Sequence, residues 1–501
     1  MNNQPLGSGS GGCFRVFSLL ASAVFGLAGC TAGPDFVRPA APNFTAYDND
    51  QAPPAGSPTA TPSRIVQGQA LPAQWWDLFQ APGLKEVLDQ AIAANQTLVA
   101  ARATLAQAKE AIVQAKSTWY PTVSLGASVG KNFIGAGTDQ YSHGMVSNQF
   151  SLGPSISYTF DIAGQTARTV EQAKANAENQ HYQLAAAYLT LTSSAVTQAI
   201  TLAVTQKLLV TTEDLIKNDE KNLELVQKSY LIGTAAQTDV LTAQAQLEND
   251  RTQLPALHQQ LSVARHALSV LVGQAPSQWR TPDFDFDTFK MPEQLPLSLP
   301  SELVHQRPDI LSAEALLHAD SAAIGIAAAQ LYPSLTLSIS DSYQSTVLNT
   351  LLNNASKAIS ASTNGNWTLF QGGALVSQKR AAIDAYDAQL ATYRQTVLVA
   401  FGQVADALRA IDNDAESLRL AGNALDISSK SLRLQRASYS AGKSNVLQLI
   451  TAENAYAQAS MNFVRVQGQR LQDCVTLFAA LGGGWQSKAE IALPAEQPAK
   501  S

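Results

Sequence analysis

The sequence repeats itself once at a spacing of about 209 residues, and this duplication limits the possible folds more than any other feature. A repeat this long is far larger than a solenoid unit of ~20–50 residues. We therefore predict one duplicated body, rather than the three domains that 501 residues suggest at roughly 150 residues each. Three pairs of landmarks share the offset of 209 and a fourth is offset by 212: Tyr158-Thr159-Phe160 with Trp367-Thr368-Leu369, Tyr230 to Gly233 with Tyr439 to Gly442, Leu271-Val272-Gly273 with Ala480-Leu481-Gly482, and Tyr120-Pro121 with Tyr332-Pro333.

Each copy contains two segments in which apolar residues alternate with Ser, Thr and Gly. These segments predict strands at about 119–130 and 148–160 in the first copy, and at about 333–343 and 359–369 in the second. Alternation over ~10 residues with aromatic residues at the ends is typical of transmembrane β-barrels. The pattern alone also fits a soluble sandwich with one hydrated face. Four strands cannot close a barrel, which needs about eight, so strands in a bilayer would require several chains to share one barrel.

Two long segments without proline, 166–230 and 374–439, are predicted to be helices about 100 Å long, at 1.5 Å per residue. Apolar residues recur every seven positions in the second segment, which is coiled-coil periodicity: Ile383, Leu390, Val397, Val404 and Ile411. The other faces carry neutral polar side chains that suit an aqueous bore, although periodicity alone also fits an antiparallel coiled-coil scaffold. Pro255 is expected to kink the helix that follows Asp239, because proline removes a backbone hydrogen bond.

The N-terminus has the features of an export signal. Its apolar run, residues 16–28, is shorter than the ~20 residues of a transmembrane helix and has the length of a signal-peptide core. The run ends in Leu27-Ala28-Gly29-Cys30, which resembles a bacterial lipobox. We therefore predict a signal peptide at 1–29 and an N-acyl, S-diacylglycerol lipid on Cys30. Thr31, rather than Asp, after this cysteine favours sorting to the outer membrane.

The remaining boundaries follow from composition and from the repeat. Residues 30–73 are predicted to be a lipidated, extended segment, followed by a first structural repeat at 74–273 and a proline-rich linker at 274–300. The second structural repeat is placed at 301–485 and a flexible tail at 486–501. The acidic and aromatic run at 283–287 is interpreted as a surface-packed connector. Cys474 lies in a helical pattern and is predicted to be a core residue.

Composition excludes several classes of protein. Charged residues make up 14%, against about 25% in typical soluble domains, and the net charge of −6 argues against nucleic-acid binding. Three cysteines exclude a disulfide scaffold. The sequence contains no P-loop, HExxH or CxxC motif, and its six histidines are scattered. We therefore predict no catalytic residues, no metal site and no cofactor apart from the covalent lipid.

Several motifs resemble those of outer-membrane efflux lipoproteins, the TolC-like channels of the OprM/NodT branch. Residues 299–314 (LPSELVHQRPDILSAE) resemble the signature that opens the second repeat of that family, and 30–39 resemble its mature N-terminus. The segment 75–79 (WWDLF) resembles the start of its first helix, and 439–447 resembles its second periplasmic turn. The resemblance covers about residues 27–485. It implies a mainly α protein with membrane β-structure, in which three copies form a 12-stranded β-barrel and a long periplasmic α-barrel.

The resemblance also implies a function and partners. It identifies the chain as the passive exit duct of a tripartite efflux pump, which exports small molecules such as drugs or toxic compounds across the outer membrane. A periplasmic adaptor protein and an inner-membrane pump of the RND type are the implied partners, together with outer-membrane lipid. The alternatives are a protein-export duct of a type I secretion system and a non-channel scaffold of coiled coils in the envelope.

The two turns between the long helices and their successors are the implied gate, opened by rotation of helices at the periplasmic tip. The resemblance assigns the gate to these residues: Asp239, Tyr230, Tyr439, Thr451 and Glu453. Thr451 stands four residues after Leu447, where such channels often carry Asp, which weakens the case for a ring of aspartates. A helix cap and packing aromatics are the structural alternatives for Asp239 and the two tyrosines. The implied adaptor contacts are Gly233, Thr234, Gly442, Lys443, Asn445 and Leu447.

Overall fold

The computed structural model describes residues 31–40, 47, 64–69, 71–134 and 145–485. The predicted signal peptide, Cys30 and the predicted C-terminal tail therefore lie outside the described residues, as does much of the predicted extended segment 30–73. The chain divides into two compact units, which we call the strand unit and the tip unit. The strand unit takes Met1–Arg38, Ala106–Asn179 and Ala313–Tyr393, and the tip unit takes Pro39–Leu105, Gln180–Ser312 and Arg394–Ser501.

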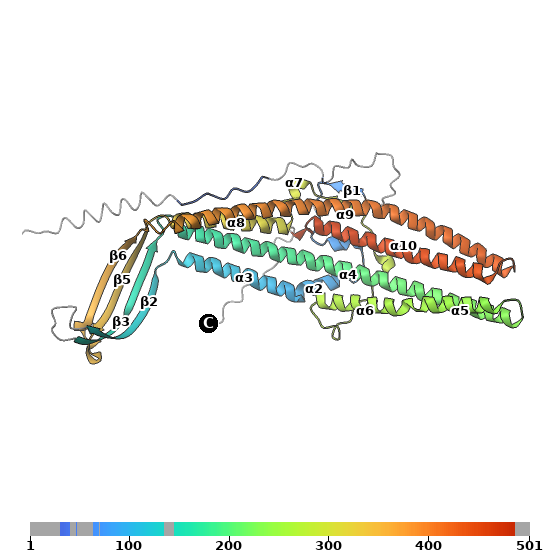
Figure 1. Ribbon diagram of the computed structural model, residues 1–501, viewed down its shortest axis with the longest axis horizontal. Helices are drawn as coiled ribbons and strands as arrows, with labels where there is room; N and C mark the ends of the chain where they lie inside the picture. Colours follow the sequence, from blue (N-terminus) through green and yellow to red (C-terminus); the bar gives the residue numbers. More distant parts are fainter. Residues whose placement is uncertain (1–30, 41–46, 48–63, 70, 135–144, 486–501) are drawn as a thin grey trace, which may run out of the picture. The chain divides into compact units, whose positions relative to one another are not determined.

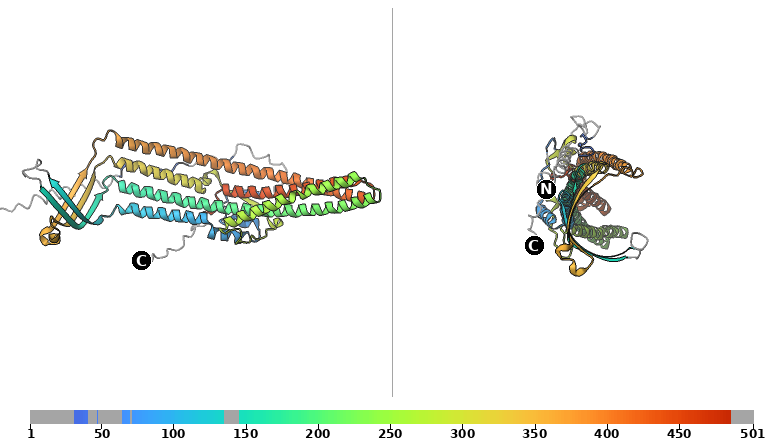
Figure 2. Two further views of the ribbon diagram at one scale, coloured as in Figure 1. Left: turned by 60° about the horizontal axis from the view of Figure 1, so that its bottom comes forward. Right: turned by 90° about the vertical axis from the view of Figure 1, so that its left-hand side faces the viewer.

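The strand unit contains one antiparallel sheet of four strands in the order β2-β3-β5-β6 (Figures 1 and 2). Strands occur at all four predicted places, with shifted bounds: β2 (Thr122–Ile134), β3 (Met145–Phe160), β5 (Ser334–Ser345) and β6 (Lys357–Asn366). Two short 3-10 helices, η3 (Leu348–Thr350) and η4 (Asn354–Ser356), connect β5 to β6. Strand β6 ends three residues before the predicted end at 369 because its last residue, Asn366, pairs with Ser334, the first residue of β5.

The two faces of this sheet carry different side chains, and its two outer strands each leave one edge unpaired within the described chain. Cross-strand hydroxyl pairs line one face: Ser124 with Ser155, Ser128 with Ser151, and Ser340 with Ser360, each 2.8 Å apart. Apolar side chains at alternate positions of β2, such as Leu125 and Val129, are exposed. Within the described chain, β2 and β6 each pair along one side only. An apolar face and two open edges are therefore presented to whatever surrounds this sheet.

The two proline-free segments form α4 (Gln165–Leu231) and α9 (Ala374–Ser440), each 67 residues long, as predicted (Figure 1). The helices before the strand pairs are α3 (Gln96–Ser117) and α8 (Pro308–Ala329). Windows of α4 and α8 are apolar enough to cross a membrane by composition, but 50% and 67% of these windows are buried. Burial of this extent is equally typical of core helices.

The tip unit contains the helices that follow the long ones and several shorter elements. They are η1 (Trp75–Phe79), α2 (Leu84–Ala94), α5 (Gln237–Arg251), α6 (Gln253–Leu271), η2 (Phe286–Thr288), α7 (Pro300–Leu303) and α10 (Val446–Ala480). Strands β1 (Arg64–Gln67) and β4 (Gln294–Leu297) form a parallel pair. The predicted extended segment and the predicted linker thus each contain a strand. In the acidic and aromatic run, Phe284 and Phe286 are buried while the intervening aspartates face outward.

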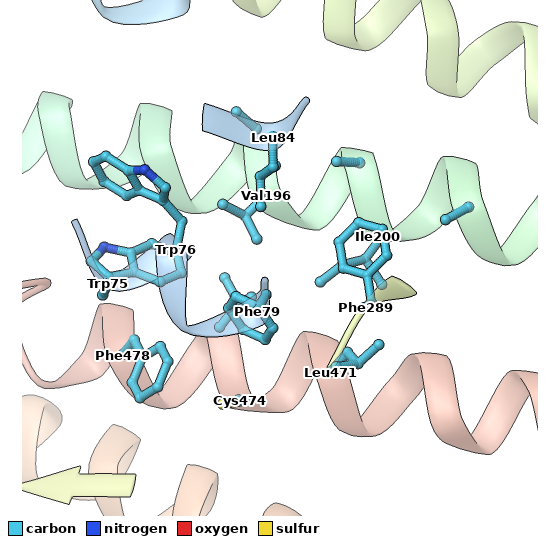
Figure 3. Close-up of a cluster of buried hydrophobic side chains, with 14 of the residues drawn as sticks. Trp75, Trp76, Phe79, Leu84, Val196, Ile200, Phe289, Leu471, Cys474 and Phe478 are labelled. Atoms are coloured by element: carbon cyan, nitrogen blue, oxygen red, sulfur yellow. The ribbon is translucent and has the colours of Figure 1, made fainter. Parts of the chain in front are cut away.

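The core of the tip unit is built around the tryptophan motif (Figure 3). Helix η1 places Trp75, Trp76 and Phe79 between side chains of α4 and α10, and the ring centroids of Trp75 and Phe478 lie 5.6 Å apart. The motif forms a separate 3-10 helix before α2 rather than the first turn of that helix. Cys474 is fully buried in this core, as predicted, and burial raises the pKa of its thiol.

The predicted interruption at Pro255 is confirmed. Helix α5 ends at Arg251 and α6 begins at Gln253, so Pro255 is the third residue of the new helix. A proline is tolerated there because the first N–H groups of a helix lack partners within that helix. The residue 209 positions later, Val464, lies inside α10, which continues without a break.

Candidate functional site

The two predicted tip turns have the same backbone geometry. Gly233 and Gly442 adopt left-handed conformations, with φ of 77° and 69°, which a residue with a side chain rarely adopts. The amide of Gly233 donates to the carbonyl oxygen of Tyr230 at 2.9 Å, and Gly442 donates to Tyr439 at 3.0 Å. The following residues, Thr234 and Lys443, donate to Ser229 and Ser438, both at 2.9 Å. These bonds satisfy carbonyl groups at the ends of α4 and α9.

The structure brings the two tip turns together through a small apolar cluster. Its buried members come from α4, α5 and α10: Val226, Ala243, Val446 and Ile450. Tyr439 packs against this cluster and is half-buried, whereas Tyr230 is 45% exposed. Tyr439 thus contributes to packing, as the structural alternative stated. Neither contact tests a gate role for the two tyrosines, which stays a prediction.

Asp239 and Thr451 make local bonds within their own helices. The Oδ2 atom of Asp239 accepts the amide of Ala236 at 3.0 Å, so this carboxylate satisfies the N-terminus of α5. The Oγ1 atom of Thr451 donates to the carbonyl oxygen of Leu447 at 2.8 Å, and Thr451 is exposed. The capping alternative for Asp239 therefore has direct support. A gate role for either residue stays a prediction.

Glu453 connects three helices inside the tip unit. It is 5% exposed, and its Oε1 atom accepts from Nη2 of Arg436 on α9 at 3.0 Å. Its Oε2 atom accepts from Nδ2 of Asn222 on α4. The pair of Glu453 and Arg436 lies beside a groove of about 450 Å³ between α4, α9 and α10, which Arg433 and Tyr456 also line. Glu453 is thus an interhelical contact within this unit, and its predicted gate role stays a prediction.

A second acidic group, which the sequence analysis missed, lies next to Glu453. Asp219 on α4 and Asp250 on α5 are 3% and 6% exposed. Asp250 accepts hydrogen bonds from Gln246 at 2.8 Å and from Gln253 at 2.9 Å. Burial, a hydrogen bond to Asp250 and the charges of Asp250 and Glu453 raise the pKa of Asp219 to about 8. The carboxyl group of Asp219 therefore holds its proton to a higher pH than an ordinary aspartate does.

Exposed aromatic residues gather where the helices of the strand unit meet its strands. Trp119 and Tyr120 precede β2, Tyr332 precedes β5, and Trp367 and Phe370 follow β6. Exposed rings at the ends of transmembrane strands form the aromatic girdle of a membrane interface. The strand ends of this sheet carry the same arrangement of exposed rings.

The described residues contain no group of three His, Cys, Asp or Glu side chains that could hold a metal ion. Cys474 is the free cysteine of the described chain, and its buried thiol has a raised pKa, which opposes the thiolate form.

Comparisons with known proteins agree with this architecture. The family model for "Outer membrane efflux protein" matches residues 87–274 and 299–483, one stretch for each copy of the duplication. The chain is 30% identical over 464 residues to the pyoverdine export outer membrane protein OpmQ of Pseudomonas aeruginosa. This alignment covers 86% of the present chain and 95% of OpmQ. It is 26% identical over 472 residues to the toluene efflux pump outer membrane protein TtgC of Pseudomonas putida, covering 93% and 96%.

Solved structures share the fold. The outer-membrane channel OprN superposes with a TM-score of 0.81 at 26% identity, covering 91% of this chain and 100% of that one. The CmeC outer membrane channel of Campylobacter jejuni gives 0.83 at 21% identity, covering 91% and 95%. The duplicated arrangement of helices and strands is therefore that of outer-membrane channels.

Proposed function

The chain belongs to the outer membrane efflux protein family, and from that premise we propose that three copies assemble into the exit duct of a tripartite efflux pump. Family membership makes the chain an outer-membrane efflux channel. The observation that carries the assembly is the four-stranded sheet, which leaves β2 and β6 unpaired along one side within the described chain. A bilayer does not tolerate open edges. Three such sheets supply 12 strands, more than the roughly eight that a closed barrel needs.

Lipidation of Cys30 supplies a second attachment to the outer membrane. The support is the lipobox-like sequence, together with a relative from Salmonella typhimurium that is named a probable outer membrane lipoprotein, SilC. Acyl chains add about 0.8 kcal/mol of membrane binding per buried CH₂ group. We place the tip unit in the periplasm, because the aromatic residues that mark a membrane boundary belong to the strand unit.

The tip turns are the proposed contact for a periplasmic adaptor, which connects the channel to an inner-membrane pump of the RND type. The paired turns present exposed residues at the end of the tip unit, among them Gly233, Thr234, Gly442, Lys443 and Leu447, beside the capping residue Asn445. The substrates are proposed to be small molecules. The support is that named relatives export pyoverdine and toluene.

Opening is proposed to separate contacts at the tip without chemistry in this subunit. Asp239, Tyr230, Tyr439 and Thr451 are the proposed gate residues at the turns, with Glu453 holding the helices behind them. Separation of the turns would have to disrupt the apolar cluster of Val226, Ala243, Val446 and Ile450.

Single-channel recording in planar bilayers tests this proposal. The purified wild-type protein is expected to conduct weakly, and a Tyr439→Ala, Asp239→Ala double variant is expected to conduct more. Asp214→Ala is the control, because Asp214 is an exposed carboxylate of α4 paired with Lys217 on the same helix. A trimer that never conducts, even with the tip contacts removed, would refute a duct. Co-purification of an adaptor and an RND pump tests the partners separately.

A further inference from the structure

Residues 31–38 lie in close contact with α4, α8 and the turn between β3 and α4, a surface of the strand unit that we call the docking surface. The amide of Ala32 donates to the carbonyl oxygen of Ala163, in the turn between β3 and α4, at 2.9 Å. A Cβ atom on Gly164 would lie 2.8 Å from the side chain of Thr31. A Cβ atom on Gly325 of α8 would lie 3.0 Å from the carbonyl oxygen of Ala32. The first distance is shorter than real Cβ contacts and the second is tighter than most of them, so the two glycines allow this segment to approach closely.

Arg168, near the start of α4, recognises the main chain of this segment. Its side chain is 5% exposed. Its Nε atom donates to the carbonyl oxygen of Ala32 at 3.2 Å, and Nη2 donates to the carbonyl oxygen of Gly33 at 3.4 Å and to Asp35 at 2.7 Å. Nη1 donates to Glu171 at 2.7 Å, which fixes the guanidinium plane. A buried arginine thus makes most of its hydrogen bonds to an N-terminal segment that carries no regular secondary structure.

The second half of the segment contacts α8. The ring of Phe36 stacks on that of His318 with centroids 4.5 Å apart, and Nε2 of His318 lies 2.9 Å from Oε1 of Glu171. Arg38 pairs with Glu314, whose side chain is nearly buried. The segment therefore bridges α4, which belongs to the first repeat, and α8, which belongs to the second.

We infer that this docking surface is a receptor for the chain's own N-terminal segment, and that Arg168 is the positioning residue that fixes where the lipid on Cys30 is held. The part concerning the lipid rests on the lipidation proposed above. Cys30 precedes Thr31 directly, so its Cα atom lies about 3.8 Å from that of Thr31. Thr31 contacts Gly164, four residues after the end of β3. Docking of Thr31 therefore holds the attachment point of the acyl chains near the end of β3, and the docked segment contacts both repeats.

Hydrogen exchange of the purified, full-length lipoprotein tests the receptor. The peptide that contains 31–38 is expected to be protected in the wild type. In Arg168→Ala it is expected to exchange at least ~10-fold faster, because the segment loses the donors that hold it. Arg168→Lys should give an intermediate rate, since one ammonium cannot reproduce the fork of donors. Arg380→Ala, an exposed arginine of the same unit, is the control and should leave the rate unchanged. A wild-type segment that exchanges like free peptide would overturn the inference.

Nitroxide labels test where the docked segment 31–38 lies on the strand unit. A second form of the protein separates docking from lipidation. Labels at Pro34→Cys and Tyr332→Cys, in one copy per assembly, should give a narrow distance distribution that broadens in Arg168→Ala. An equally narrow distribution in that variant contradicts the positioning role.

Mass spectrometry of the N-terminal peptide reports the lipid independently. In a form with a cleavable non-lipoprotein signal and Ala in place of Cys30, protection of 31–38 should persist. Loss of protection only in this form would mean that the lipid, and not Arg168, holds the segment.

Discussion

The turn that ends α4 and the turn that ends α9 share their backbone hydrogen bonds, yet different side chains cap the helices that follow. In the second turn Asn445 accepts the amide of Gln448 at 3.0 Å, and the side chain of Gln448 accepts the amide of Asn445 at 3.4 Å. The first turn has Ala236 at the equivalent place. Its amide donates to Oδ2 of Asp239 at 3.0 Å, and the amide of Asp239 donates to the main-chain carbonyl oxygen of Ala236, also at 3.0 Å, instead of to a capping side chain. The duplication has thus kept the glycine that the turn geometry requires, while the capping chemistry has diverged.

The two helical hairpins also bury their acids differently. In the first hairpin, burial raises the pKa of Asp219, and the two charged groups that shift it further, Asp250 and Glu453, are both acidic. In the second, burial and a hydrogen bond to Asp473 raise the pKa of Asp414 to about 7, while the charge of Arg470 lowers it. Asp414 and Asp473 are half-buried whereas Asp219 and Asp250 are buried, so weaker desolvation and the charge of Arg470 both favour the ionised form in the second hairpin.

The largest effect is expected from copying the first hairpin's proline into the second. Val464 is the counterpart of Pro255 and is buried inside the unbroken helix α10. Val464→Pro should cost about 3 kcal/mol or more, because proline removes a hydrogen bond and clashes with the preceding turn. Native-state hydrogen exchange of α10 measures the loss. Val464→Ala, which removes only buried methyl groups, is the control. Equal losses in the two variants would contradict the argument.

The next effect is a pH dependence carried by Asp219. Its folded pKa of about 8 is raised above the ordinary value of 3.8, so the stability it contributes is present at low pH and is lost as pH rises through about 8. Between pH 6 and pH 9 the loss should be about 2.7 kcal/mol, because stability falls by ~1.4 kcal/mol per pH unit until the pH reaches the folded pKa. Hydrogen exchange of α5 across this range measures it. Asp219→Asn should flatten the profile and Asp214→Asn should not. An unchanged slope in Asp219→Asn would show that another group titrates.

A smaller effect is expected from exchanging the caps of the two turns. Asn445→Ala should destabilise the start of α10 by about 1 kcal/mol, because the amide of Gln448 loses its acceptor. Ala236→Asn should stabilise the start of α5 by a similar amount or less. Hydrogen exchange of the first turn of each helix measures both changes. If Ala236→Asn does not raise the free energy of local unfolding, the bond from the amide of Ala236 to Asp239 already caps the start of α5 sufficiently.

The smallest effect is expected from Pro255→Ala. Pro255 is the third residue of α6, where a backbone N–H needs no partner within the helix. The free energy of local unfolding should therefore change by less than about 0.5 kcal/mol. Exchange rates across 250–258 measure it. A loss above about 1 kcal/mol would indicate that the proline ring itself packs at the break.

Local patterns in the sequence were sufficient to predict the two long helices, the four strands of the antiparallel sheet and a break close to Pro255, but not the short strands β1 and β4. The long helices follow from an absence of proline, the strands from alternation, and the tip turns from Gly233 and Gly442, because each signal lies within a few neighbouring residues. Bounds were less accurate, as at β6, because a strand ends where its partner ends.

Only the tertiary structure decided how charged side chains are used. Glu453, predicted at the gate from its place after Leu447, is buried and contacts Arg436 and Asn222. Asp219 meets Asp250 from a different helix, and Arg168 binds Asp35 across 133 positions of sequence. No local pattern encodes such pairs, because the free energy of a buried charge depends on which distant groups the fold places beside it. The sequence by itself therefore determined the duplicated scaffold, and packing between distant segments determined which of its acids and bases meet.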